Sequence, residues 1–237
     1  MTGRLWSAAD IHMHTTYSDG APTPREVVSR AIALGLRVIA ITDHDTIDGA
    51  LEAAACDQDR CEVVIGEEVT TRQGHVLGLF LTQAVAPRKD AAETIDDIHA
   101  QGGLAIPAHP YLVLGGARGV GPECIGLAWD AIEVENGSPV SWRANRRARL
   151  AASAWARSQT GGSDAHILAA VGSVVTEYPG SSAIELRAAI QSGTTRAVRR
   201  NRSPIVAAMT MTRSIRRRLS GEAARERATR GSRAAYR

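Results

Sequence analysis

Two patterns of apolar residues alternate along the chain. Short continuous apolar runs predict buried strands at 38–42, 61–65, 76–81, 104–108 and 131–135. Apolar residues at three- and four-residue spacing predict amphipathic helices at 23–34, 47–55, 90–101, 141–156 and 182–191. Two further strands are predicted before Asp164 and at 171–176. This alternation predicts an α/β fold built on a parallel sheet with crossover helices.

The first helix has the clearest start signal. Thr23 is a good capping residue, Pro24 suits the first helical position, and Glu26 completes a capping box. Gly35 follows the apolar face and predicts the end of the helix. Six to seven strand–helix units of this kind are enough to close a barrel, in which the chemistry lies at the C-terminal ends of the strands.

Length and composition fit one such barrel. The chain has 237 residues, and aromatic residues make up only 4% of it, so the core must be mainly aliphatic. No apolar run approaches the roughly 18 residues of a membrane span, and the N-terminus has no apolar stretch typical of a signal peptide. The three cysteines lack zinc-ribbon spacing, so we expect reduced thiols and a cytoplasmic location.

Charge is distributed unevenly. Residues 196–237 hold thirteen Arg and two Glu, whereas residues 1–195 carry a net charge of −8. We therefore predict a folded domain at 1–198 and a basic tail at 199–237, either partly disordered or with a helix over about 213–229. Such a tail could also contact RNA phosphates or an anionic membrane surface.

Histidines and carboxylates recur at the edges of the predicted strands. His12 and His14 are two residues apart, so on a strand their side chains share one face. Six of the seven histidines follow this placement, and His99, inside a helical run, is interpreted as a solvated or packing residue. The candidate ligands at strand edges are His12, His14, Asp19, His44, Glu67, Glu68, His75, His109, Asp164 and His166. Mixed imidazole and carboxylate ligands suit Mn²⁺, Fe²⁺ or Zn²⁺.

Together, these motifs resemble the PHP family, named for polymerase and histidinol phosphatase. The resembling segments are 10–14 with 18–20, 41–45, 66–69, 74–78, 108–110 and 162–166. The resemblance implies a distorted seven-stranded (β/α) TIM-like barrel of the small stand-alone kind, followed here by the basic C-terminal extension. It also implies a trinuclear centre, with Mn²⁺ favoured over Fe²⁺ or Zn²⁺.

The resemblance also implies a ligand set. One ion would be held by His12, His14, Glu67 and Asp164. Glu67 would bridge to a second ion held by His75 and His109. A third would be held by Asp19, His44 and His166. Glu67 is preferred to Glu68 on the family position alone.

The expected activity is metal-dependent hydrolysis of a phosphomonoester, such as a nucleotide or small metabolite, by a metal-bridging hydroxide. An exonuclease that trims short RNA or DNA oligonucleotides is the alternative. A catalytically silent metal-binding module is less favoured, because the ligand set is complete.

Outside the metal ligands, the sequence suggests only supporting groups. Arg118 and Arg143 are candidates for binding substrate phosphate. Thr15, Asp43 and Asp45 are candidates for orienting the imidazoles. The sequence indicates no distinct general acid.

Overall fold

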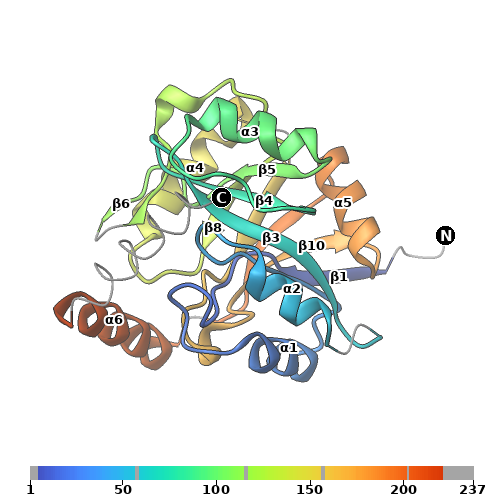
Figure 1. The fold of residues 1–237 in the computed structure, drawn as a ribbon, viewed down its shortest axis with the longest axis vertical. Coiled ribbons are helices and arrows are strands. Elements are labelled where there is room, and N and C mark those ends of the chain that lie inside the picture. The colour runs from blue at the N-terminus through green and yellow to red at the C-terminus, as the bar shows by residue number, and fades with distance from the viewer. Residues whose placement is uncertain (1–4, 57–58, 115–116, 156–157, 202, 221–237) are drawn as a thin grey trace.

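The computed structural model describes residues 5–56, 59–114, 117–155, 158–201 and 203–220. A curled seven-stranded sheet forms its centre, in the order β11-β10-β1-β2-β3-β4-β5 (Figure 1). Its strands are β1 (Trp6–Asp10), β2 (Val38–Ile41), β3 (Glu62–Thr70), β4 (His75–Leu79), β5 (Leu104–Pro107), β10 (Val174–Pro179) and β11 (Arg196–Arg199).

A second, two-stranded sheet extends the curl toward a barrel. It pairs β8 (Ala131–Asn136) with β9 (Ser158–Gly162) in parallel. β8 packs beside β5, and β9 packs beside β10 and β11, so this pair bridges the two edges of the large sheet. A short hairpin of β6 (Val113–Leu114) and β7 (Ala117–Arg118) stands apart.

Helices pack on the outside of the strands, except for the last one, which packs beside a short 3₁₀ turn. They are α1 (Pro24–Ala33), α2 (Asp48–Ala54), α3 (Ala91–Ala100), α4 (Trp142–Trp155), α5 (Ala183–Ser192) and α6 (Pro204–Leu219), with short 3₁₀ turns η1 (Pro122–Cys124) and η2 (Leu168–Ala170). The expected capping box starts α1: the Thr23 hydroxyl accepts the Glu26 N–H at 3.3 Å, and the Glu26 carboxylate accepts the Thr23 N–H at 2.8 Å. The α/β prediction with its helix positions is confirmed.

The expectation of a parallel sheet holds only in part. The pairs β1–β2 and β2–β3 are parallel, but β3–β4, β4–β5, β1–β10 and β10–β11 are antiparallel. The reason is clearest at β4, because residues 71–74 joining it to β3 are too few for a parallel crossover. The result is a distorted barrel.

The core is aliphatic, as the composition predicts. Side chains such as Ile39, Ile41, Leu77 and Ile106 are fully buried along the strands. Tyr178 is the one aromatic residue among the largest fully buried side chains of the described part of the chain.

The C-terminal helix begins earlier than expected. α6 starts at Pro204, where Ser203 Oγ accepts the Val206 N–H at 3.3 Å, and it ends at Leu219. The predicted helix at 213–229 therefore overlaps α6 only in part, and residues 221–229 lie outside the described residues. Arg199, placed in the tail by the sequence analysis, ends β11. None of the described helices combines the length and apolarity that a membrane crossing requires.

Candidate metal centre

The candidate ligands meet at one mouth of the barrel. His12 and His14 follow β1, and His109 follows β5. His75 is instead the first residue of its strand. In a parallel sheet, that position would lie at the opposite end from the other ligands. Because β4 is antiparallel, its first residue pairs with Thr70 at the end of β3, and Val76 pairs with Pro107 at the end of β5. Strand reversal therefore brings His75 to the same mouth as the other ligands.

Glu68 lies at the centre of the group and is 1% exposed. One carboxylate oxygen, Oε1, is 2.8 Å from His75 Nδ1 and 2.9 Å from His109 Nε2. The other, Oε2, is 3.2–3.3 Å from imidazole nitrogens of His12, His14 and His44. A single buried carboxylate thus contacts five imidazoles, as a bridging ligand would.

The structure places Glu68 where the resemblance led us to expect Glu67. Successive residues of a strand point to opposite faces, so only one of the two can enter the mouth. Glu67 points away, and its Oε2 accepts the Val85 N–H at 2.8 Å. Burial raises the pKa of Glu67 to about 8. The choice of Glu67 is therefore corrected to Glu68 in the assignment below.

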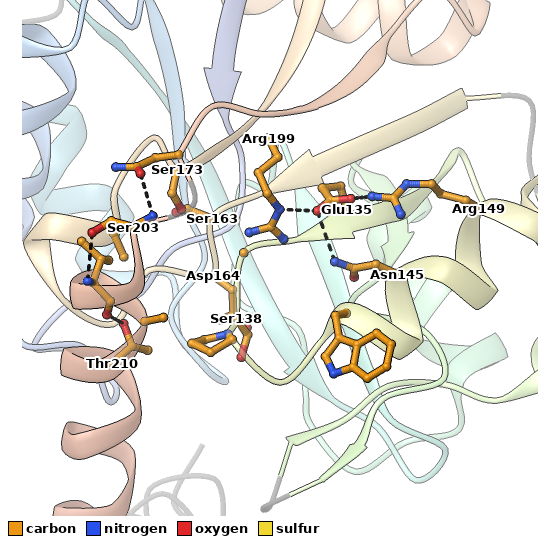
Figure 2. Close-up of a pocket in the computed structure, with 17 residues that line it drawn as sticks. Glu135, Ser138, Asn145, Arg149, Ser163, Asp164, Ser173, Arg199, Ser203 and Thr210 are labelled. Carbon is orange, nitrogen blue, oxygen red and sulfur yellow. Dashed lines mark hydrogen bonds and ion pairs between the residues drawn. The ribbon is translucent and has the colours of Figure 1, made fainter.

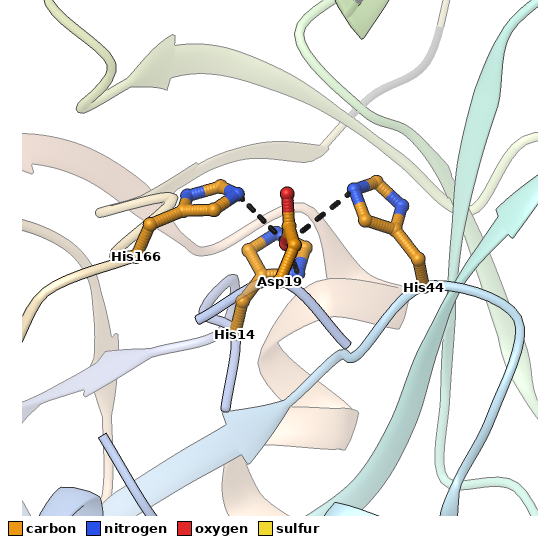
Figure 3. Close-up of side chains that lie close together, drawn as sticks. All are labelled: His14, Asp19, His44 and His166. Atoms are coloured by element: carbon orange, nitrogen blue, oxygen red, sulfur yellow. Dashed lines mark ion pairs between the residues drawn. The ribbon is translucent and has the colours of Figure 1, made fainter. Parts of the chain in front are cut away.

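A second group surrounds Asp19 (Figure 3). Its Oδ1 is 3.0 Å from His166 Nε2, 3.6 Å from His14 Nδ1 and 3.9 Å from His44 Nε2. The side chains come from the loops after β1, β2 and β9, and all converge on the carboxylate. His14 belongs to both groups, because its Nε2 is 3.2 Å from Glu68 Oε2.

Asp164 connects the two groups. Its Oδ1 lies 3.2 Å from His14 Nε2, 3.6 Å from His12 Nε2 and 3.5 Å from His166 Nδ1. Asp164 has a positive φ of 50°, an uncommon backbone conformation for a residue other than glycine. Such strain is typical of functional sites, and here it accompanies a carboxylate placed among three imidazoles.

The donor set fits divalent ions. Four groups have ligand atoms within 4.8 Å of one another: His14–Asp19–His44–His166, His12–His109–Asp164, His12–His14–Glu68 and His44–Glu68–His75. Several buried atoms within these groups make no hydrogen bond in the described part of the chain: His12 Nε2, His14 Nε2, His44 Nδ1, His109 Nδ1 and Asp19 Oδ1. Buried polar atoms are normally satisfied, so this concentration indicates that a ligand belongs there.

The electrostatics keep the central carboxylate anionic. Burial opposes ionisation of Glu68, but the neighbouring imidazoles, His44 first, hold its pKa well below its usual range. Burial also acts to lower the pKa of His14, yet the neighbouring carboxylates of Asp164 and Glu68 outweigh it and raise the pKa to about 10. Burial lowers the pKa of His44 to about 3. Divalent ions bound to the imidazole nitrogens would supply the positive charge that balances these carboxylates.

Glu133 on β8 is a contributor that the sequence analysis missed. Its Oε1 lies 2.9 Å from His12 Nδ1, and its Oε2 accepts the His109 N–H at 2.6 Å. Asn136 Nδ2 donates to the same Oε2 at 3.1 Å. A proton on His12 Nδ1 leaves Nε2 free to bind an ion. The available signal was an acidic residue inside the apolar run at 131–135.

Asp43 and Thr15, the candidates for orienting the imidazoles, hydrogen-bond to each other near His14, and their orienting role stays a prediction. Asp43 accepts hydrogen bonds from the Thr15 N–H at 2.7 Å and from the Ser18 hydroxyl at 2.5 Å. Ser18 Oγ is 3.5 Å from His14 Nδ1, so Asp43 acts on the loop that carries His14. Asp45 instead accepts the Thr70 N–H at 2.7 Å and fixes the end of β3.

The remaining candidates lie outside the cluster. Arg118 is exposed in β7, and Arg143 is exposed on α4 with its guanidinium 4.8 Å from the Trp142 ring centroid. Among the described residues, neither contacts the clustered ligands, so their phosphate role stays a prediction. His99 Nε2 lies 2.8 Å from Asp130 Oδ2, away from the mouth.

A cavity of about 330 Å³ opens beside Asp164 (Figure 2). It is lined from α4 by Trp142, Asn145 and Arg149, and from α6 by Val206, Ala207 and Thr210. Glu135 on its wall forms ion pairs with Arg149 and Arg199. The cavity therefore lies beside one member of the histidine–carboxylate cluster, Asp164, and is large enough for part of a small substrate.

The chain matches two protein families and several known proteins. The PHP domain family matches residues 10–113, and the PHP-associated family matches residues 142–195. The chain is 38% identical over 140 residues to an uncharacterised protein of Methanocaldococcus jannaschii, covering 54% of this chain and 81% of that protein.

Enzymes of known activity match over shorter stretches. A 5′-3′ exoribonuclease of Haemophilus influenzae is 44% identical over 75 residues, which are 30% of this chain and 27% of the enzyme. A 3′,5′-nucleoside bisphosphate phosphatase of Chromobacterium violaceum is 41% identical over 80 residues, 32% of this chain and 28% of the enzyme. The chain thus spans less than a third of the length of either enzyme.

Among solved structures, a two-domain protein from Bacteroides vulgatus containing a predicted PHP-like metal-dependent phosphoesterase has the same fold. The TM-score is 0.68 at 21% identity, over 84% of this chain and 66% of that one. The likeness to that structure shows the shared fold, and in this chain that fold brings the clustered histidines and carboxylates to the barrel mouth. The chain belongs to the PHP family, as the sequence motifs predict.

Proposed function

We propose that the protein hydrolyses a phosphomonoester, a nucleotide or a small phosphorylated metabolite, with three divalent ions bound at the barrel mouth. The observation that carries the proposal is Glu68, a buried carboxylate in contact with five imidazoles. The similarity to a nucleoside bisphosphate phosphatase supports a nucleotide substrate.

The proposed ligands are all members of the clusters, and their division among the ions is the one that the family resemblance implies, with Glu68 in place of Glu67. His12, His14 and Asp164 would hold one ion, with Glu68 bridging to a second held by His75 and His109. Asp19, His44 and His166 would hold the third. Imidazole and carboxylate donors suit Mn²⁺, and Fe²⁺ or Zn²⁺ as alternatives. When bound, such ions lower the pKa of coordinated water and neutralise charge on the phosphoryl oxygens.

The chain's own groups orient this centre. Glu133 accepts a hydrogen bond from His12 Nδ1 and another from the His109 backbone N–H, which fixes both groups. Asp43 fixes the loop that carries His14 and Ser18. The cavity beside Asp164 would receive the part of the substrate that does not react. Cys61 and Cys124 are buried and form no disulfide within the described residues, which suits the cytoplasmic location that we propose.

The similarity to an exoribonuclease favours a second candidate, removal of nucleotides from short oligonucleotides at the same centre. A product assay separates the two. Free phosphate released from mononucleotides supports the phosphomonoesterase, whereas nucleotides released from RNA oligomers support the exonuclease.

The first experiment is removal and return of metal. Chelator-treated protein should lose hydrolysis of phosphate esters, and Mn²⁺ should restore it. Mass-spectrometric metal analysis of the same samples should show about three ions per chain in the active state, as a centre of clustered ions requires. Full activity in protein that retains no metal would contradict the proposal.

A further inference from the structure

The C-terminal helix α6 reaches the metal centre. It follows both family matches, which end at residues 113 and 195. Val206 packs against a hydrophobic core cluster, which fixes the start of the helix on the body of the protein. Thr210, one turn further on, lines the cavity beside Asp164 (Figure 2). α6 therefore forms one wall of the approach to the centre.

Two arginines of α6 then contact a proposed metal ligand. Arg217 Nη1 lies 2.7 Å from Asp19 Oδ2 and donates to the Asp19 backbone carbonyl at 2.9 Å. Arg213 Nη2 donates to the same carbonyl at 3.2 Å. The Arg217 side chain is only 12% exposed, so its contact with Asp19 is protected from solvent.

The two oxygens of the Asp19 carboxylate have different surroundings. Oδ2 is engaged by Arg217, whereas Oδ1 faces His14, His44 and His166 (Figure 3). Oδ1 is buried and makes no hydrogen bond within the described residues. A guanidinium that engages one oxygen and the backbone carbonyl fixes both the rotamer of the carboxylate and the loop that carries it.

We propose that Arg217 is a positioning residue that holds Asp19 in its metal-binding orientation, which makes α6 a working part of the metal centre. The inference rests on the proposed function, because it assigns Asp19 to an ion. Partners that orient a ligand from outside commonly change metal affinity by about 10- to 100-fold. Arg213 supports the same carbonyl and should contribute less.

The test compares Arg217→Ala with Arg216→Ala in the full-length protein. Arg216 is exposed on the same helix, so its replacement removes the same charge one residue away. Calorimetric titration of metal-free protein with Mn²⁺ should show the affinity of one ion weakened about 10-fold in Arg217→Ala. Arg216→Ala should bind Mn²⁺ like the unchanged protein.

Hydrolysis measured over a range of Mn²⁺ gives a second readout. For Arg217→Ala, we expect more Mn²⁺ to be needed for half-maximal rate, with most of kcat recovered at saturating Mn²⁺ and KM little changed. A raised KM at saturating Mn²⁺ with unchanged Mn²⁺ affinity would mean that Arg217 binds the substrate directly, and would overturn the positioning role.

Thermal unfolding of the metal-free variants serves as the control for correct folding. If Arg217→Ala fails to fold, Arg217→Met takes its place, because Met keeps a long unbranched side chain but cannot donate a hydrogen bond to Asp19. Mn²⁺ affinity in the folded variant equal to that of Arg216→Ala would refute the inference. Absence of Mn²⁺ binding by the unchanged protein would instead refute the proposed function, so the two failures are distinguishable.

Discussion

At the scale of single residues, neighbours on one strand have separate roles. Glu67 and Glu68 are both buried in β3, yet only Glu68 faces the imidazoles. The sequence predicted that an acid at this strand end binds metal, but it could not indicate which, because the strand's register relative to the mouth depends on pairing with β4. Glu133 was missed for a similar reason: its partner His12 is 121 positions away in the sequence.

Replacing the two acids by Gln tests the corrected assignment. Glu68→Gln should lower kcat/KM by more than about 100-fold, beyond the range typical of groups outside the metal ligands. Glu67→Gln should retain most activity, because burial raises the Glu67 pKa to about 8 and an amide oxygen can still accept the Val85 N–H. Steady-state kinetics with Mn²⁺ checks both. Loss in Glu67→Gln with retention in Glu68→Gln would restore the assignment from family position.

Glu133→Gln tests the orienting role. An amide accepts a weaker hydrogen bond from His12 Nδ1 than a carboxylate does, so the neutral tautomer with Nε2 toward the ion is less well fixed. Mn²⁺ affinity should fall about 10- to 100-fold. Titration with Mn²⁺ measures this, and an unchanged affinity would assign Glu133 a purely structural role at the His109 backbone.

At the scale of secondary-structure elements, the start of a helix was predicted more reliably than the direction of a strand. The capping box of α1 was predicted from Thr23 and Glu26, because its hydrogen bonds join residues three apart. The direction of β4 was not predicted correctly, because the repeating strand–helix pattern suggested that every strand is parallel to its neighbours. The four-residue connection at 71–74 was the available clue.

The α1 cap provides a prediction confined to that element. Thr23→Ala removes an acceptor for the Glu26 N–H, which typically costs about 1 kcal/mol of stability. For a chain of this size, the melting temperature should fall by about 2–4 °C. Calorimetry of metal-free protein measures the change. Thr23→Ser, which keeps the hydroxyl, should melt close to the unchanged protein, and both variants should retain activity.

At the scale of the whole molecule, the centre exists only in the folded barrel. Folding brings His12 and Asp164, which are far apart in the sequence, within 3.6 Å of each other, and Arg217 adds a contact from the last described helix. From the charge distribution alone, the sequence predicted an acidic body and a basic tail. It could not show that the tail's helix returns to the acidic mouth, because no pattern within α6 indicates its partner.

Because the unfolded chain cannot assemble these ligands, ion binding should stabilise the fold. Mn²⁺ at about 100 times its dissociation constant should add about 2.7 kcal/mol for one site, which corresponds to a rise of about 5–10 °C in melting temperature. Differential scanning calorimetry at several Mn²⁺ concentrations measures the shift. Glu68→Gln should show a much smaller rise because it lacks the central bridging carboxylate. An equal rise in both proteins would place the stabilising ions elsewhere on the molecule.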